Sequence, residues 1–232
     1  MDERQIKKHP KTYRVAHKSI RKGKTARIGR RGLHDLDDYY RGLTGFNVNI
    51  FGTSNNDTTY GEVTNGGILA LVECFKRHAP LSKFSPEQRN FFDLGCGVGR
   101  AVAGISILVP EIRSNGIEIV PERFRIAQVA LGRIHSKQLS SRIQIRQGSF
   151  LDAGISFHSV CWIFISNLSF TAEVQRAVAE RLEKECLSGC VIVCCRELPF
   201  STDSQRFEKV DSKITIPMSW SVTSTCDVYR RK

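Results

Sequence analysis

Three glycines that alternate with other residues follow an apolar run that ends in an acid, in the segment Phe91-Phe92-Asp93-Leu94-Gly95-Cys96-Gly97-Val98-Gly99-Arg100. Such glycines let the backbone pass close to a ligand and adopt φ and ψ values that other residues avoid. Asp93 lies at the carboxyl end of the expected strand, which is where open α/β sheets bind ligands. The segment therefore predicts a nucleotide-type ligand at a strand-to-helix turn.

Two features of this turn favour S-adenosylmethionine over a nicotinamide or flavin dinucleotide. The carboxylate of Asp93 would repel a pyrophosphate but attract a cation, such as the amino group of a methionine moiety. The glycines also depart from the dinucleotide pattern G-x-G-x-x-G, because Arg100 stands where its last glycine would be.

Two later segments supply candidates for the rest of such a ligand. Glu118 ends the expected second strand, where an acid can hydrogen-bond ribose hydroxyls; a solvated strand-end acid is the alternative. After the expected third strand, Phe150 could stack on adenine and Ser149 could meet its edge, although Phe150 could also be a core residue.

The segment Ile165-Ser166-Asn167-Leu168-Ser169-Phe170 follows the expected fourth strand, at the same edge of the sheet. Polar side chains between apolar residues at this edge suggest a site that positions a nucleophile. A helix N-cap formed by Ser166, Asn167 or Ser169 is the alternative interpretation.

The elements that must position these residues follow from hydrophobic periodicity. We expect an irregular stretch over 32–60, a helical stripe over 68–75 that ends near Pro80, and a capping box at Ser85. Strands are expected over 91–94, 115–120, 142–146, 160–165 and 191–195, and helices over 101–108, from Pro121, and over 170–187. The stretches 214–217 and 222–229 could form a closing antiparallel pair. This βαβαβ alternation predicts an α/β protein with a parallel, doubly wound sheet.

Positive charge is concentrated at the N-terminus. Of the 35 Lys and Arg residues, 12 lie within residues 1–31, so that an almost neutral body carries a basic arm. The arm is interpreted as a binding segment for the duplex backbone, without sequence preference. A solubilising tail or a nuclear-import signal are the alternatives. The candidate contact residues recur every three or four positions: Lys7, Lys8, Lys11, Arg14, Lys18, Arg21 and Lys22.

Composition argues against several other classes. The 232 residues fit one sizeable domain, no apolar run approaches the roughly 18 residues of a membrane helix, and the first residues do not read as a secretory signal. Cys186, Cys190 and Cys194 recur every four residues, but without accompanying histidines they are interpreted as reduced core thiols. We therefore expect no membrane, no metal and a reducing compartment.

Four segments match, in order and spacing, the motifs of one enzyme family: Tyr60-Gly61-Glu62, Asp93-Leu94-Gly95-Cys96-Gly97-Val98-Gly99, Trp162-Ile163-Phe164-Ile165-Ser166-Asn167-Leu168-Ser169-Phe170 and Ser219-Trp220-Ser221. The chain resembles the seven-strand class of S-adenosylmethionine-dependent methyltransferases. Within it, the chain resembles the disruptor-of-telomeric-silencing family, the histone lysine methyltransferases that lack a SET domain. The resemblance covers residues 60 to about 225.

The resemblance implies a role for each matching position. Ser166 and Asn167 would orient the reacting groups, and Phe170 and Trp220 would border a narrow channel for the target lysine. The cofactor would be held by Tyr60, Gly61, Glu62, Val63, Phe91, Asp93, Gly95, Cys96, Gly97, Val98, Gly99, Arg100, Glu118, Ser149 and Phe150.

Some positions depart from the family pattern. Val63 replaces a Thr, Arg100 replaces a Gln, Ser149 replaces an acid, and Ser166 replaces the first of two asparagines. Asp227-Val228 lies where a Tyr pair is usual, with Tyr229 nearby. The family's basic extension usually follows the catalytic domain, whereas here a basic arm precedes it.

The resemblance also implies the organisation and the partners. We expect a flexible basic arm over 1–31, a loop and helix over 32–80, and a Rossmann-like methyltransferase core over 81–232, whose mostly parallel sheet has seven strands. The implied reaction methylates a core-histone lysine in the nucleosome, within the nucleus, with core histones and the DNA backbone as partners. A nucleic-acid, small-molecule or other protein methyltransferase of this fold, and a noncatalytic chromatin-binding relative, remain open.

Overall fold

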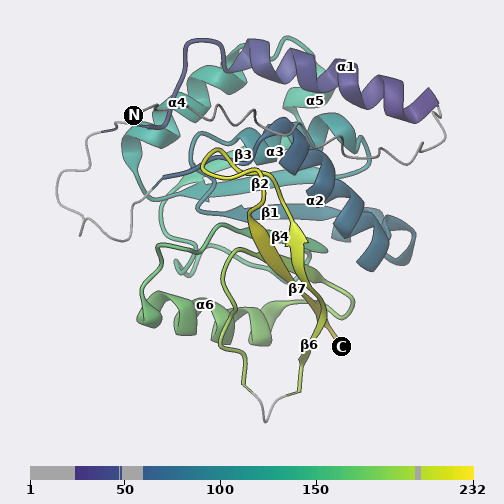
Figure 1. The fold of residues 1–232 in the computed structure, drawn as a ribbon, viewed down its shortest axis with the longest axis vertical. Coiled ribbons are helices and arrows are strands. Elements are labelled where there is room, and N and C mark those ends of the chain that lie inside the picture. Colours follow the sequence, from purple (N-terminus) through teal and green to yellow (C-terminus); the bar gives the residue numbers. More distant parts are fainter. Residues whose placement is uncertain (1–23, 47, 49–59, 202–204) are drawn as a thin grey trace, which may run out of the picture.

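A seven-stranded sheet forms the centre of the molecule (Figure 1). The computed structural model describes residues 24–46, 48, 60–201 and 205–232. The strands run in the order β3-β2-β1-β4-β5-β7-β6. Their bounds are Asn90–Leu94 (β1), Arg113–Glu118 (β2), Ile143–Gln147 (β3), Trp162–Ile165 (β4), Val191–Cys194 (β5), Phe207–Thr215 (β6) and Thr225–Arg231 (β7).

The first five strands are parallel, whereas β7 runs antiparallel between β5 and β6. The sequence correctly predicted the parallel, doubly wound sheet and the closing antiparallel pair. The bounds of that pair were wrong, because β6 is polar and half-buried along most of its length and therefore lacks a strong apolar signal.

Helices cover both faces of the sheet: Lys24–Tyr39 (α1), Asn65–His78 (α2), Arg100–Leu108 (α3), Pro121–Gly132 (α4), Lys137–Ser140 (α5) and Ala172–Glu185 (α6). Short 3-10 turns span Leu81–Lys83 and Pro86–Gln88. One cluster of buried side chains packs the helices α1, α2, α3 and α4 against one face of the sheet. A second cluster packs α6 against the other face. Figure 1 accordingly shows α6 on the side of the strands opposite α1 and α2.

The central strands are apolar along their whole length because both of their faces are covered. Every residue of β4 and β5 is buried. Trp162 of β4 stacks on Phe75 of α2 with 5.1 Å between ring centroids, and its indole Nε1 donates to the carbonyl of Ala79 at 2.8 Å. This contact fixes α2 against the middle of the sheet.

The prediction of an irregular stretch from residue 32 is wrong up to Tyr39, because residues 32–39 belong to α1. The expected boundary between residues 31 and 32 falls inside this helix. Leu33, Leu36 and Tyr40 are buried against α3, a spacing that places them on one helical face. The many charges between these three residues concealed the apolar stripe. The short α5 was also missed.

Within the described residues, no helix combines the length and apolar character that a membrane span requires. His, Cys, Asp and Glu side chains there also form no group of three or more that could hold a metal ion. The eight cysteines are free thiols, and all except Cys195 are buried, as expected for core residues.

Candidate active site

The glycine turn joins β1 to α3 with a backbone that only glycine adopts easily. Gly95, Gly97 and Gly99 have φ values of 84°, 57° and 84°. A Cβ on Gly97 would lie 2.4 Å from the ring of Tyr60, so that a larger residue would displace that ring. Both reasons for the glycines that the sequence offered, unusual dihedrals and close approach, therefore hold at position 97.

Two tyrosine hydroxyls hold the peptide groups of Val98 in the middle of this turn. Tyr40, which follows α1, donates to the Val98 carbonyl at 2.9 Å, and the Val98 N–H donates to the Tyr60 hydroxyl at 3.3 Å. At the start of the turn, Gly95 N–H and Cys96 N–H both donate to the carbonyl of Ile117 in β2 at 3.0 Å. The turn is thus fixed from three directions.

Glu118 at the end of β2 is buried and faces the same turn. Its Oε2 accepts from the Gly97 N–H and its Oε1 from the Val120 N–H, each at 2.8 Å. Burial raises the pKa of Glu118, and these two hydrogen bonds oppose the shift. Glu118 is therefore not an ordinary solvated acid, and its remaining acceptor positions can receive ribose hydroxyls.

Asp93 is buried at the end of β1. Burial raises its pKa well above the usual range, and the nearby Glu118 and Cys195 add to that effect. Among the described residues, none donates a hydrogen bond to its side chain. A positive charge next to this carboxyl would stabilise its ionised form, as the ammonium group of a methionine moiety would.

A pocket of about 280 Å³ opens where β1 to β4 end. Eight of the residues predicted from the sequence line it: Tyr60, Gly61, Gly95, Glu118, Ser149, Phe150, Ser166 and Phe170. The structure therefore brings together residues from the loop over 60–63 (the cofactor loop), the glycine turn and the segments after β2, β3 and β4. This is the edge of the sheet where the sequence predicted a ligand.

The other predicted residues do not line the pocket: Glu62, Val63, Phe91, Asp93, Cys96, Gly97, Val98, Gly99, Arg100, Asn167 and Trp220. Phe91 is a core residue with its ring edge-on to Phe75, and Val63 is buried where it pairs with Met218. The predicted arm residues Lys7, Lys8, Lys11, Arg14, Lys18, Arg21 and Lys22 lie outside the described residues.

Phe150 and Phe170, predicted for the adenine end and for the lysine channel, stack on each other in the pocket, with 5.4 Å between ring centroids. Phe170 also reaches the glycine turn, because a Cβ on Gly95 would lie 3.6 Å from its ring. The side chain of Ser149 accepts from the Leu151 N–H at 3.1 Å and thereby caps the turn after β3. One apolar wall therefore spans both predicted ends of the site.

Ser166 and Asn167 differ in their surroundings. Ser166 lines the pocket, and its Oγ lies 3.9 Å from the Sγ of Cys195. Asn167 is fully buried: its Nδ2 donates to Gln175 Oε1 and to the Arg196 carbonyl, and its Oδ1 accepts from the Arg196 N–H, all at 2.8 Å. Asn167 thus ties the segment after β4 to α6 and to the segment after β5.

Helix capping does not explain these polar residues, since the N-cap of α6 is Thr171, which accepts from the Val174 N–H at 3.3 Å. Trp220 stands at the edge of the pocket. A Cβ on Gly61 would lie 2.0 Å from its ring, so the ring packs closely against the backbone of the cofactor loop. Hydrogen bonds of 2.7 and 2.9 Å between Ser219 and the backbone of Glu62 hold the two segments together.

The sequence missed several lining residues: Ile117, Ile119, Val120, Arg123, Gly148, Leu151, Ser169 and Val174. Arg123 matters most among them. It is buried, its guanidinium lies 4.3 Å from the ring centre of Tyr60, and its Nε donates to the Gly45 carbonyl at 3.3 Å. Burial lowers the pKa of Arg123, whereas Glu118 and Tyr60 raise it. Its place in the first turn after β2 was the available signal.

Comparison with known proteins identifies the family to which this chain belongs. A family model described as histone methylation protein DOT1 matches residues 53–225. The chain belongs to the DOT1 family. This membership confirms the resemblance seen in the sequence. The seven-strand, mostly parallel sheet is the Rossmann-like arrangement that the resemblance implied.

This DOT1-family chain is similar to several individual proteins at low sequence identity. A protein-lysine N-methyltransferase of Saccharolobus islandicus (strain REY15A) is 30% identical over 102 residues, which cover 44% of this chain and 58% of that protein. The glycopeptide N-methyltransferase MtfA shares the fold with a TM-score of 0.51 at 11% identity, over 70% of this chain and 88% of its own. An RNA methyltransferase of Salinibacter ruber has a TM-score of 0.44 at 19% identity, over 68% of this chain and 89% of its own.

Proposed function

We propose that this chain transfers a methyl group from S-adenosylmethionine to the side-chain nitrogen of a lysine in a core histone of the nucleosome. The observation that carries the proposal is the pocket itself, where the glycine turn and Glu118 meet Ser166 and Phe170. Membership of the DOT1 histone methylation family supports a histone as the substrate. The relative named as a protein-lysine N-methyltransferase supports lysine as the residue that is methylated.

The residues present fit the cofactor. Asp93, a buried carboxyl without a hydrogen-bond donor in the described part of the chain, suits the ammonium of the methionine moiety. Glu118 suits the ribose hydroxyls, and the Phe150 ring suits the adenine. When bound, S-adenosylmethionine supplies a methyl group that its positively charged sulfur has already activated.

The main task of the protein is then to align and desolvate the incoming amine. A free lysine has a pKa of about 10.4 and must lose its proton before it can attack. Apolar walls such as the Phe170 and Trp220 rings favour the neutral amine, because burial penalises the charged form. Ser166 lines the pocket, and its Oγ would accept a hydrogen bond from that amine and so orient it.

The proposed partners are the core histones and the DNA backbone of the nucleosome, and the proposed location is the nucleus. The charge of the first 31 residues supports the DNA contact, because an arm of this composition neutralises phosphates irrespective of base sequence. Deleting residues 1–23 should therefore weaken nucleosome methylation and flatten its dependence on salt. Equal activity and equal salt dependence of the full chain and the deletion variant would contradict a role of the arm in DNA binding.

The reaction is tested by transfer of radiolabelled methyl groups to nucleosomes, free core histones and naked DNA in parallel. We expect label on a histone lysine, and more with nucleosomes than with free histones. Label on DNA alone would instead make the chain a nucleic-acid methyltransferase. Cofactor binding without label on any acceptor would make it a noncatalytic chromatin-binding relative.

A further inference from the structure

Arg100, at the first position of α3, is turned away from the cofactor pocket. The family resemblance placed it among the cofactor-binding residues, but its guanidinium is occupied elsewhere. Nη2 donates to Asp37 Oδ1 of α1 at 2.7 Å and to Asn65 Oδ1 of α2 at 2.9 Å. The guanidinium also lies 5.2 Å from the ring centre of Tyr40, and the side chain is only 17% exposed.

The same side chain is connected to the pocket through two residues of the cofactor loop. Arg100 Nε lies 3.9 Å from Glu62 Oε2, and the Tyr60 hydroxyl donates to Glu62 Oε1 at 2.8 Å. Tyr60 in turn lines the pocket and accepts from the Val98 N–H of the glycine turn. A continuous path of charged and hydrogen-bonded groups therefore runs from α1 to the pocket wall.

We infer that Arg100 and Asp37 are positioning residues, which set cofactor affinity by docking α1 and holding Glu62 and Tyr60 against the glycine turn. Neither side chain touches the pocket, so both act through their neighbours. The inference deepens the proposed function and rests on it for the identity of the cofactor.

The local charges explain why one arginine has this role. Arg100 lies between the carboxylates of Asp37 and Glu62, and Asn65 completes the arrangement by donating from Nδ2 to Asp37 Oδ2 at 2.9 Å. Without the arginine, the two acids repel each other and Glu62 loses its cation. The Tyr60 ring would then be held less firmly over Gly97.

The spacing of the α1 contacts supports the same conclusion. Asp37 and Tyr40 are three residues apart at the end of α1, so they point in a similar direction. Asp37 reaches Arg100, and Tyr40 reaches the Val98 carbonyl at 2.9 Å. The end of α1 thus contacts both the turn that holds the cofactor and the residue that follows it.

The test is a double-mutant cycle on the full chain with Arg100→Ala, Asp37→Ala and the double variant, read out as S-adenosylhomocysteine affinity by calorimetry. We expect Arg100→Ala to bind about tenfold more weakly and Asp37→Ala to lose less, because Arg100 also contacts Asn65 and Glu62. The double variant should be little worse than Arg100→Ala, because Asp37 acts through Arg100. With an active acceptor, the KM for S-adenosylmethionine should rise while kcat at saturating cofactor stays within about twofold.

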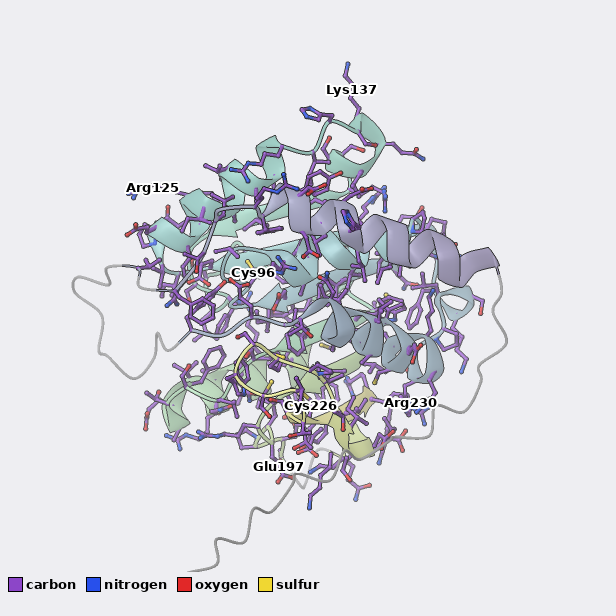
Figure 2. The ribbon with its side chains drawn as sticks, turned by 45° about the horizontal axis from the view of Figure 1, so that its top comes forward. Cys96, Arg125, Lys137, Glu197, Cys226 and Arg230 are labelled. Carbon is purple, nitrogen blue, oxygen red and sulfur yellow. The ribbon has the colours of Figure 1, made fainter. Side chains whose placement is uncertain are left out.

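Arg230→Ala is the matched control, because Arg230 pairs with Glu208 through Nη2 at 2.6 Å on the antiparallel strands. Figure 2 shows Arg230 and Cys96 of the glycine turn in separate parts of the molecule. Asp37→Asn, which keeps an acceptor atom but loses the charge, and Arg100→Lys, which keeps the charge, should both give intermediate affinities. Thermal melting of each variant establishes that it is folded.

Unchanged affinity in both single variants would overturn the positioning role, as would strictly additive losses in the cycle. A fall in kcat without a change in KM would also contradict it. Failure of the proposed function gives a different result. A wild-type chain that binds no S-adenosylhomocysteine would contradict the assignment of the cofactor before any variant is compared.

Discussion

Gly97→Ala is the substitution for which the structure gives the clearest expected magnitude. Gly97 has a φ of 57°, and forcing this conformation on a residue with a Cβ costs roughly 1–2 kcal/mol. The new Cβ would also lie 2.4 Å from Tyr60 Cε2 and 2.9 Å from its hydroxyl. Because real Cβ atoms do not approach other atoms this closely, the Tyr60 ring must move.

Moving Tyr60 disrupts its hydrogen bonds to Glu62 and from the Val98 N–H. Each is worth about 1 kcal/mol net, so that holding the pocket wall in place becomes about 2 kcal/mol less favourable. With about 1.4 kcal/mol per factor of ten, cofactor affinity should fall about thirtyfold. Calorimetric titration with S-adenosylhomocysteine measures this directly.

Gly42→Ala separates the cost of the positive φ from the cost of displacing the Tyr60 ring. Gly42 also has a positive φ, 73°, but nothing lies within 4 Å of the position that its Cβ would take. This variant should lose roughly 1–2 kcal/mol of unfolding free energy and bind the cofactor as the wild type does. Cofactor affinity of Gly97→Ala within twofold of the wild type, or an equal loss in Gly42→Ala, would refute the reasoning.

Four further substitutions distinguish the roles of neighbouring residues. Asn167→Ala should lower the unfolding free energy by about 2–4 kcal/mol in chemical denaturation, because it leaves buried partners such as Gln175 unsatisfied, whereas Ser166→Ala should lower kcat and leave stability unchanged. Asp93→Asn should stabilise the cofactor-free protein at pH 7 and weaken cofactor binding. The sign follows from the raised pKa of Asp93: the folded state favours its protonated form, so ionisation costs stability as pH rises, and the advantage of Asn should vanish below the ordinary carboxyl pKa. Trp220→Ala should raise the KM of the histone acceptor more than that of the cofactor, since the ring stands at the pocket edge.

For Asn167→Ala, Asp93→Asn and Trp220→Ala, one outcome would contradict each expectation. Equal unfolding free energies for Asn167→Ala and the wild type would mean that the observed hydrogen bonds do not hold the segment. Denaturation curves that give the Asp93→Asn variant the same advantage at pH 3 and pH 7 would exclude a titrating carboxyl as its source. A Trp220→Ala enzyme with unchanged acceptor KM would remove the ring from the acceptor path.

The parts of the site that the sequence predicted are those with a local signature. The glycine turn, Glu118 and the segment after β4 lie at the ends of predicted strands, and the carboxyl ends of parallel strands must meet at one edge. The buried strands β4 and β5 were equally clear, because runs such as Trp162–Ile165 contain no polar residue.

The parts that were missed depend on contacts between distant segments. Arg123 reads as a surface residue of an amphipathic helix, and only the folded chain places its guanidinium over Tyr60. Asp37 and Tyr40 belong to a stretch dense in charge, where three apolar positions carry the whole helical signal. Arg100 matched a family motif, yet its side chain is directed by Asp37, a residue 63 positions away in the sequence.

The pair Ser166 and Asn167 illustrates how far a motif alone can assign chemistry. Consecutive side chains of an extended segment point to opposite sides, so two adjacent polar residues after a strand seldom share one task. Here Asn167 uses its side-chain amide to bind Gln175 and Arg196, and Ser166 is left to face the pocket. Because Asn167 fixes the backbone on which Ser166 stands, the position of the Ser166 hydroxyl is set by buried hydrogen bonds. Under the proposed function, the group that meets the acceptor amine would be the hydroxyl of Ser166 where the family pattern has an asparagine, and the hydrogen bonds of Asn167 would fix its position.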